Sequence, residues 1–187
     1  MKTTSNFLGI TLNQLILKTL FDSLKEYSKK NNIQNTIEIQ NQNSVHITLY
    51  YLDKDINKSV FEQIQKDLFD LNKEKIHISL DKVSFFNKED KNYICYLSPR
   101  FPKKLEKINL YLKQKYISNA IDNNYQYIPH ITVFKIINFS IYKQHEKNIL
   151  KIINTFCSEN SKIDLYQSLN LYTVDSTQSP EKQKIIA

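Results

Sequence analysis

The tripeptide His-Ile-Thr occurs twice in this chain, at His46–Thr48 within SVHITLYYL and at His130–Thr132 within YIPHITVFK. Both copies lie in apolar, β-branched runs that are typical of strands. Residues two apart in a strand point to the same face. Each histidine therefore shares a face with its threonine, and the isoleucine between them points to the opposite face, where helices would cover it. The repeat predicts two equivalent strands, each with one imidazole and one hydroxyl on the same side.

The elements around the two tripeptides also repeat in order. A helix, a His-Ile-Thr strand, a second helix and a second strand lie between Gln14 and Phe86, and the same order returns between Lys103 and Val174. No Pro- or Ser-rich linker separates the two stretches, so we expect one α+β domain over residues 1–187, with pseudo-equivalent lobes at 14–86 and 103–174. Hydrophobic periodicity predicts strands at 6–12, 44–52, 75–86, 93–97, 127–137 and 163–174, and helices around 17–27, 59–71, 105–112 and 149–156.

The chain is basic, with a formal net charge of +7 and an isoelectric point of about 9.2. Such a charge favours an anionic partner, such as RNA or a nucleotide. Asn, Lys and Ile are abundant throughout the sequence, however, and Arg100 is the only arginine. The charge therefore permits an anionic partner without identifying one.

Several classes of protein are excluded by composition. Gly9 is the only glycine, so a glycine-rich phosphate loop is ruled out and side chains must bind any phosphate. No apolar run reaches the roughly 18 residues of a membrane span, so we expect no membrane partner. Cys95 and Cys157 match no metal or redox spacing, which favours the reducing cytoplasm. A cytoplasmic monomer is the simplest expectation.

A histidine in a strand is more often a half-buried structural residue than a catalyst, and two further histidines illustrate this. His77, in KIHISL, imitates the motif but falls on a different expected strand, and His145, in YKQHEK, lies in a charged helix and is expected at the solvated surface. Only His46 and His130 combine identical tripeptides, similar flanks and symmetric placement. We expect this pair to be functional.

On these residues the sequence resembles the two-histidine (2H) phosphoesterase superfamily. Two H-x-T motifs about 80 residues apart, in helix-flanked strands of a small α+β protein, are its signature, and SVHITLYYL and YIPHITVFK look most like the RNA 2′,5′-ligase (LigT-like) and 2′,5′-phosphodiesterase branch. The resemblance extends from NFLGITL to LNLYTV. It implies a bilobal fold in which two antiparallel sheets flank a central cleft, with helices outside.

The resemblance also implies the chemistry of the four motif residues. Opening a 2′,3′-cyclic phosphate needs a base that activates water and an acid that protonates the leaving ribose oxygen, and histidine suits both roles near neutral pH. By resemblance His130 is the base and His46 the acid, the product is a 2′-phosphate, and Thr48 and Thr132 hold the phosphate oxygens. No metal or other cofactor is implied, because no carboxylate cluster lies beside either histidine.

Three further residues are candidates for substrate binding. Tyr50 and Phe134 continue the faces of the two motifs and are expected to stack on a base. Lys135 stands five residues after the second histidine, where bacterial ligase relatives often carry an arginine that contacts phosphate. Strict alternation points Lys135 away from His130, so this role requires the strand to end or bulge there.

Three functions remain open from the sequence. The first is a phosphodiesterase, or reversible ligase, acting on 2′,3′-cyclic or 2′-5′ linkages of RNA. The second applies the same chemistry to a signalling nucleotide, such as 2′-5′ oligoadenylate or a cyclic dinucleotide, as a viral or phage protein that disarms nucleotide-based immunity would. The third is a non-catalytic RNA-binding module, which the intact motifs argue against.

Overall fold

The computed structural model describes residues 4–52, 58–73, 76–89, 91–116, 126–175 and 185–186. Strands and helices alternate much as the sequence predicts. In chain order they are β1 (Thr4–Leu12), α1 (Gln14–Lys30), β2 (Ile37–Ile39), a 3₁₀ turn η1 (Gln42–Ser44), β3 (His46–Leu52), α2 (Lys58–Asn72), β4 (Leu80–Lys88), β5 (Lys91–Pro99), α3 (Pro102–Lys115), β6 (Ile131–Ile136), α4 (Phe139–Glu159), β7 (Tyr166–Asp175) and β8 (Ile185–Ile186).

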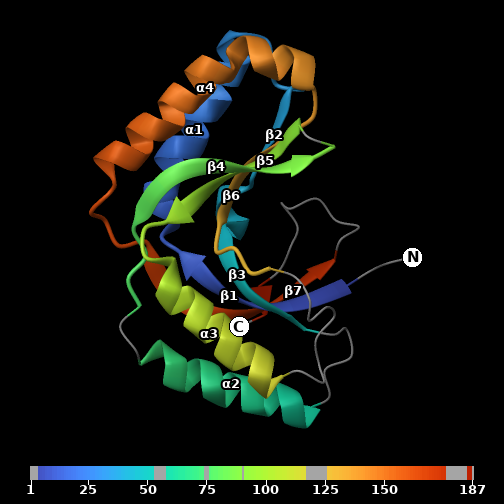
Figure 1. The fold of residues 1–187 in the computed structure, drawn as a ribbon, viewed down its shortest axis with the longest axis vertical. Helices are drawn as coiled ribbons and strands as arrows, with labels where there is room; N and C mark the ends of the chain where they lie inside the picture. Colours follow the sequence, from blue (N-terminus) through green and yellow to red (C-terminus); the bar gives the residue numbers. More distant parts are fainter. Residues whose placement is uncertain are drawn as a thin grey trace.

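The strands form two antiparallel sheets, one with the order β3-β1-β7-β8 and the other β2-β6-β5-β4. Figure 1 shows α1 and α4 on the outer side of the second sheet and α2 and α3 on the outer side of the first. The inner faces of the two sheets look toward each other. The expected α+β class, with two antiparallel sheets and helices outside, is confirmed.

The two sheets are related by a pseudo-twofold repeat of elements. In the first, β3 lies beside β1 and β1 beside β7; in the second, β6 lies beside β5 and β5 beside β4. The expected order of helix, motif strand, helix and strand is present as α1-β3-α2-β4 and α3-β6-α4-β7. The last strand of each half joins the sheet of the other half, however. The lobes therefore do not coincide with residues 14–86 and 103–174, because each sheet draws strands from both halves.

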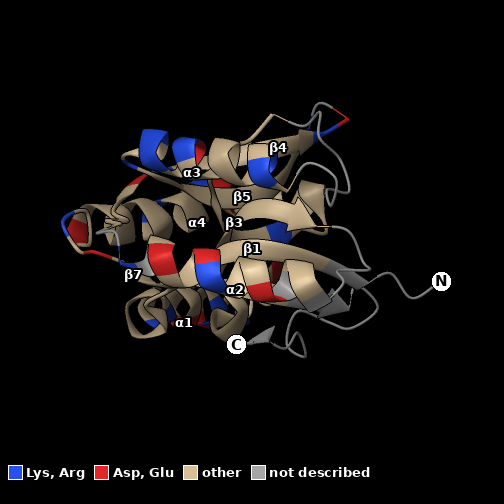
Figure 2. Ribbon diagram, turned by 90° about the horizontal axis from the view of Figure 1, so that it is seen from below, with Lys and Arg blue, Asp and Glu red and all other residues tan. Residues whose placement is uncertain are grey.

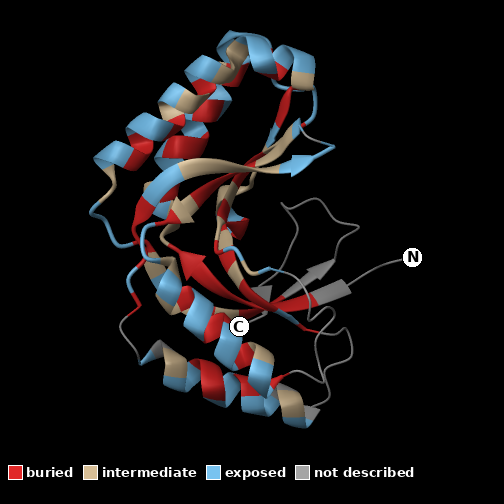
Figure 3. Cartoon of the chain, in the orientation of Figure 1, coloured by how far each residue is buried: buried red, intermediate tan, exposed pale blue. Residues whose placement is uncertain are grey.

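Each sheet buries one face against its helices. In β1, the fully buried Leu8, Ile10 and Leu12 alternate with residues of the inner face. In α1, apolar residues at helical spacing, including Leu17 and Leu24, complete the core against the second sheet. Figure 3 shows this as buried inner stripes on helices whose outer sides are exposed. Burying one such side chain contributes about 1.5–3 kcal/mol, so the two layers fix the inner faces that carry the motifs.

No described helix has both the length and the apolar character needed to cross a bilayer.

Candidate active site between the two sheets

The two motif histidines are held by the same hydrogen bond. His46 Nδ1 lies 2.7 Å from the carbonyl oxygen of Ser44, and His130 Nδ1 lies 2.7 Å from the carbonyl oxygen of Ile128. A carbonyl oxygen only accepts, so each Nδ1 carries the hydrogen and donates it to the residue two positions earlier. Each neutral ring then has its lone pair on Nε2. Both imidazoles are thereby fixed in the tautomer that a proton acceptor requires.

Each histidine also rests against a stacked aromatic pair. The His46 ring lies 4.7 Å from Phe7 and 5.2 Å from Tyr172, and the rings of Phe7 and Tyr172 are stacked at 4.8 Å. The second sheet repeats the arrangement with two other rings. The His130 ring lies 4.8 Å from Phe86 and 5.5 Å from Tyr96, which stack at 4.3 Å. The first pair comes from β1 and β7, and the second comes from β5 and β4, which are the equivalent strands of the other sheet.

The only glycine of the chain makes room for the first aromatic pair. A Cβ at Gly9 would lie 3.0 Å from the carbonyl oxygen of Ile47 and 3.1 Å from the Tyr172 ring. Beyond that ring, the Tyr172 hydroxyl lies 2.6 Å from Thr11 Oγ1, and Asn170 Nδ2 donates to the same oxygen at 2.5 Å. The ring beside His46 is therefore fixed at both ends.

Burial sets the protonation of the two histidines. It lowers the pKa of His46 from 6.5 to about 4, although the hydrogen bond to Ser44 opposes it, and the nearby His130 lowers this pKa further. Burial also lowers the pKa of His130, against the effect of its hydrogen bond to Ile128. Both rings are neutral at pH 7, and His46 is the more strongly shifted.

Thr48 and Thr132 lie on the same faces as the histidines and are half-buried. Within the described parts of the chain neither side-chain hydroxyl bonds to another protein group. The strands β3 and β6 contact each other where the sheets meet, and Thr48 of the first motif and His130 of the second line one small cavity there. His46 and Thr132 are not among the described residues that line it. Hydroxyl donors and a proton acceptor around one space suit a tetrahedral phosphate.

A bulge in each motif strand changes which later residues reach this space. Gly9 pairs with Thr48 and Leu8 with Tyr50, so Leu49 is an extra residue in β3. In the other sheet Tyr96 pairs with Thr132 and Cys95 with Phe134, so an extra residue follows Thr132 in β6 as well. After each bulge the alternation of faces is shifted by one position.

The bulges overturn two of the expected base-stacking residues. Tyr50 and Phe134 are both fully buried, at 0% exposure, and point into the cores beneath the helices. The expectation that they stack on a base is therefore wrong. Strict alternation placed them on the inner faces, and a bulge leaves no clear mark in a run of apolar residues. Lys135, in contrast, shares the face of Thr132, which is the condition that its expected role required.

Tyr51 takes the place that strict alternation gives to Tyr50. Its side chain is 40% exposed, and with Thr48, Phe86, His130 and other residues it lines a small cavity of about 100 Å³ between the sheets. Gln126, Tyr127 and Ile128 also line it, among the residues that the structure describes. None of these additional residues was expected from the sequence. Only the aromatic character of YIPHIT and SFF pointed toward such a surface.

Lys135 itself packs on an aromatic ring. Its Nζ lies 5.1 Å from the centre of the Tyr93 ring, and its pKa is raised, first by the Tyr93 hydroxyl and further by the charge of Glu38. Lys135 therefore stays protonated, on the same face of β6 as Thr132.

Hydrogen bonds between β3 and the segment of α3 and its C-cap Tyr116 fix the bulge in β3. The buried Asn109 donates from Nδ2 to the carbonyl oxygen of Leu49 at 2.6 Å, and the Tyr50 hydroxyl donates to the carbonyl oxygen of Tyr116 at 3.3 Å. On the inner side, Tyr127 donates to the carbonyl oxygen of Thr48 at 3.2 Å. A buried carbonyl without a partner is costly. Asn109 thus positions the strand that carries His46, a role that sequence alone did not indicate.

The other two histidines lie outside this site. His77 is exposed and its Nδ1 pairs with Asp164 at 3.0 Å, just before β4 rather than within a strand. His145 is not a solvated surface residue as expected, because it is partly buried and its Nδ1 bonds to the Tyr27 hydroxyl at 3.0 Å. Among the described residues, no group of three or more His, Cys, Asp or Glu side chains is arranged to hold a metal ion.

Comparison with known families matches this arrangement to one of them. Residues 4–182 match the profile of the family described as "AKAP7 2'5' RNA ligase-like domain". The chain belongs to this family. The match covers almost the whole sequence and, with the structural relatives below, places this RNA ligase-like protein in the 2H phosphoesterase superfamily.

Solved structures share the fold of this 2H phosphoesterase at low sequence identity. Escherichia coli LigT, solved with 3′-AMP, is 14% identical with a TM-score of 0.60, over 100% of this chain and 95% of LigT. A structure described as a phosphoesterase is 13% identical (TM-score 0.57; 98% and 94% covered), and Kluyveromyces marxianus Usb1 is 12% identical (0.51; 93% and 95%). No curated protein sequence matches significantly. The LigT-like fold expected from the motifs is confirmed.

Proposed function

We propose that this chain is a metal-independent phosphodiesterase that opens 2′,3′-cyclic phosphates or cleaves 2′-5′ linkages at RNA ends. The observation that carries the proposal is the mirrored pair of histidines, each with Nδ1 bound to a backbone carbonyl and Nε2 left for the substrate. LigT, which shares this fold, was solved with 3′-AMP, and this supports a nucleotide as the ligand of this chain.

The reaction requires one proton acceptor and one proton donor. One Nε2 takes a proton from water as the water oxygen bonds to phosphorus; the bond from phosphorus to the ribose 3′ oxygen breaks, and the other Nε2–H protonates that oxygen. The products are a 2′-phosphate and a free 3′ hydroxyl, and solvent returns the histidines to their starting states. Thr48 and Thr132 donate to the non-bridging oxygens, on which negative charge develops.

The pKa values favour a division of labour opposite to the one that the resemblance implies. A base must be neutral and an acid must be protonated at the working pH. The pKa of His46 is lowered to about 4, so this ring is neutral and able to accept a proton at the working pH. A bound phosphate raises the pKa of both rings, and His130, whose pKa is lowered less, is protonated first. We therefore assign His46 as base and His130 as acid in ring opening. The roles exchange in the reverse reaction.

Base recognition falls to exposed aromatic side chains of the cleft. Tyr51 and Phe86 line the small cavity beside His130, and stacking contributes about 1–3 kcal/mol per base. Lys135 then contacts a phosphate as a point charge rather than as a bidentate fork. Stacking tolerates every base, so the proposal is for an RNA end of any sequence.

A substrate panel tests the proposal. The purified protein is mixed in EDTA with a short RNA ending in a 2′,3′-cyclic phosphate, with 2′-5′ oligoadenylate and with a cyclic dinucleotide, and products are followed by ³¹P NMR. We expect the cyclic RNA end to be converted to a 2′-phosphate fastest. Faster turnover of the oligoadenylate or the dinucleotide assigns the same chemistry to a signalling nucleotide, and no turnover of any of the three rejects the enzyme.

A further inference from the structure

A group of neutral polar side chains lies beside His46 on the inner face of the first sheet. Thr11 of β1 pairs with His46 on one side and with Ser168 of β7 on the other, so these three residues share a face. Asn170 and Tyr172 follow Ser168 at steps of two and lie on the same face. The strand pairing therefore brings an amide and several hydroxyls next to one motif histidine.

Thr11 Oγ1 is the centre of this group. The Tyr172 hydroxyl lies 2.6 Å from it, and Asn170 Nδ2 donates to it at 2.5 Å. Asn170 Nδ2 also donates to Ser168 Oγ at 2.9 Å. Burial raises the pKa of Tyr172, against the effect of its bonds to Thr11 and Asn170, so the phenol stays protonated. A buried hydroxyl that lost these partners would be costly, so the group holds the Tyr172 hydroxyl in one place.

The ring of Tyr172 in turn sets the plane of the His46 ring. Phe7 and Tyr172 are paired across the sheet, and their rings are parallel to within 2°. The His46 ring packs on both, tilted by 33° from Phe7 and by 34° from Tyr172. Its bond to Ser44 holds Nδ1, but the outer torsion of a histidine is broad, so the ring can still turn. Contact with the two parallel rings therefore decides where Nε2 points.

The first sheet has almost no charged residue that could take over this task. Its described strands contain no Lys, Arg or Glu, and their single Asp is Asp175, the last residue of β7. Figure 2 shows β1 without charged residues, whereas the helices carry many. Hydroxyls and one amide therefore anchor the ring beside His46.

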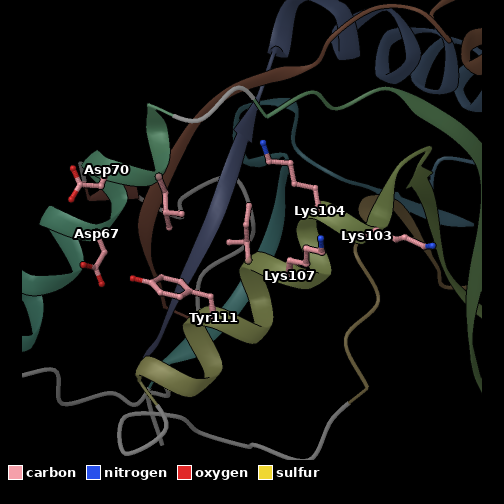
Figure 4. A pocket seen from close by; sticks show the side chains of 8 residues that line it. Asp67, Asp70, Lys103, Lys104, Lys107 and Tyr111 are labelled. Atoms are coloured by element: carbon pink, nitrogen blue, oxygen red, sulfur yellow. The ribbon is translucent and has the colours of Figure 1, made fainter.

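The polar groups on the outer side of the first sheet form a separate set. Figure 4 shows Asp67 of α2 and Tyr111 of α3 at a cavity of about 760 Å³ between these helices. Asp67 pairs with Lys115 at 2.6 Å and accepts the Tyr116 hydroxyl at 2.5 Å, which joins α2 to the end of α3. In the described part of the chain, no contact of these side chains reaches His46. The His46 ring is thus held from the inner face.

The second sheet supports His130 without such an anchor. Phe86 and Tyr96 stack beside His130, but Phe86 has no hydroxyl. Among the residues that the structure describes, the Tyr96 hydroxyl has no hydrogen-bond partner. The two halves share the aromatic pair, and only the pair beside His46 is tied to the sheet by a hydroxyl. His46 is also the histidine assigned as base, whose Nε2 must point at the attacking water.

We propose that Tyr172 is a positioning residue for His46, whose ring it holds in the plane that directs Nε2 at the water. It acts through its hydroxyl, which Thr11 and Asn170 hold, and it does not touch the substrate. The effect on turnover rests on the proposed function, whereas the geometry of the ring does not. A misplacement of about 1 Å can cost about 10²-fold in rate. A loosened ring that still samples the right plane costs less.

Removal of one oxygen atom tests the proposal. Tyr172→Phe keeps the ring and loses the hydroxyl, so we expect kcat on a cyclic RNA end to fall about tenfold while KM changes less than about twofold. Tyr27→Phe is the matched control, because it also removes a tyrosine hydroxyl bond, that to His145 at 3.0 Å between α1 and α4. Its kcat should stay within about twofold of the unsubstituted protein.

Substitutions of Thr11 show whether Tyr172 acts through this bond. Thr11→Val removes the partner of the Tyr172 hydroxyl and should lower kcat by a similar factor. The double variant Thr11→Val/Tyr172→Phe should lose less than about twofold more than either single variant, because both changes remove the same bond. Thr11→Ser keeps a hydroxyl and should retain kcat within about threefold.

NMR signals of the His46 ring measure the geometry without turnover. They are assigned by their absence from His46→Ala, and the neighbouring rings of Phe7 and Tyr172 displace them from the positions of a free imidazole. Tyr172→Phe should move them toward those positions, and Tyr27→Phe should leave them in place. The proposal is overturned if these signals do not move, or if Tyr172→Phe keeps kcat within about twofold. If the protein turns over no cyclic RNA end, the proposed function fails, and the ring signals alone decide the role of Tyr172.

Discussion

Leu49 and Val133 occupy the same place in two different sheets: each follows the threonine of a His-Ile-Thr motif, where the strand pairing skips one residue. Each bulge returns the residue five positions after a histidine to the inner face. In β3 that residue is Tyr51, and in β6 it is Lys135. The two halves thus share an irregularity as well as a motif, and it gives the cleft one aromatic and one basic side chain.

Adjacent tyrosines give the sharpest test of the bulge in β3. Tyr51→Ala should raise KM for the cyclic RNA end about tenfold, because a stacking surface worth about 1–3 kcal/mol is lost, and should change the free energy of unfolding by less than about 0.5 kcal/mol. Tyr50→Ala should instead destabilise the fold by about 3–5 kcal/mol, because a fully buried ring is removed. Urea denaturation and steady-state kinetics on both variants measure this. If β3 alternated strictly, Tyr50→Ala would raise KM and Tyr51→Ala would destabilise the fold, and that result would contradict the bulge.

Much of this fold could be predicted from the sequence, and the reasons lie in particular residues. In His46-Ile47-Thr48 a buried residue stands between two polar ones, and the same pattern returns at His130. This alternation predicts both strands and the face on which each polar side chain lies. Helical spacing of apolar residues likewise predicted α1 and α4. These patterns are local, so a single sequence carries them.

The parts that were missed depend on contacts between distant residues. The bulge at Leu49 depends on pairing with β1 and on a hydrogen bond from Asn109, 60 residues further along the chain. The aromatic support of His46 comes from Phe7 and Tyr172, at opposite ends of the chain. The exchange of β4 and β7 between the sheets is also a property of the tertiary fold. No periodicity in one segment reports such relations.

Asn109 is predicted to act as a positioning residue. Asn109→Ala leaves the Leu49 carbonyl without its partner, so we expect a loss of about 1–3 kcal/mol of stability. We also expect a fall of about tenfold in kcat/KM, because Thr48 directly precedes Leu49 and Tyr51 follows it by two residues. Asn160→Ala is the matched control, since its amide also donates to a backbone carbonyl, that of Phe156 at the end of α4. It should lose stability and keep activity. Equal activity of the two variants would argue against the positioning role.

The roles of the two histidines can be separated by the leaving group. On a cyclic RNA end, His46→Ala and His130→Ala should each lower kcat by about 10²–10⁴. On a 4-nitrophenyl phosphodiester the leaving group is 4-nitrophenolate, which needs no protonation. The loss of kcat from His130→Ala should therefore be smaller on this substrate, whereas the loss from His46→Ala should remain. The exposed His77→Ala serves as control and should stay within about threefold on both. If the loss is smaller for His46→Ala instead, His46 is the acid and His130 the base, as the resemblance implies.

Stability should fall as the solution becomes acidic. The pKa of His46 is lowered to about 4 in the folded protein, so between about pH 6.5 and pH 4 the unfolded chain binds a proton that the folded chain does not. The contribution of this group is therefore present above pH 6.5 and is lost toward pH 4, by at most about 3 kcal/mol. Urea denaturation at pH 7 and pH 5 measures the loss. It should be smaller in His46→Asn, whose amide can still donate to Ser44, and identical losses contradict the assigned pKa.

Catalysis by the two histidines without a metal is tested best by turnover of an RNA that ends in a 2′,3′-cyclic phosphate, with the protein held in excess EDTA. We predict that the unsubstituted protein opens the ring to a 2′-phosphate at the same rate with and without chelator. Both His46→Ala and His130→Ala, folded by circular dichroism, should lose nearly all of this activity. Loss of activity in EDTA with recovery on adding a divalent metal, or full activity in either histidine variant, would contradict this mechanism.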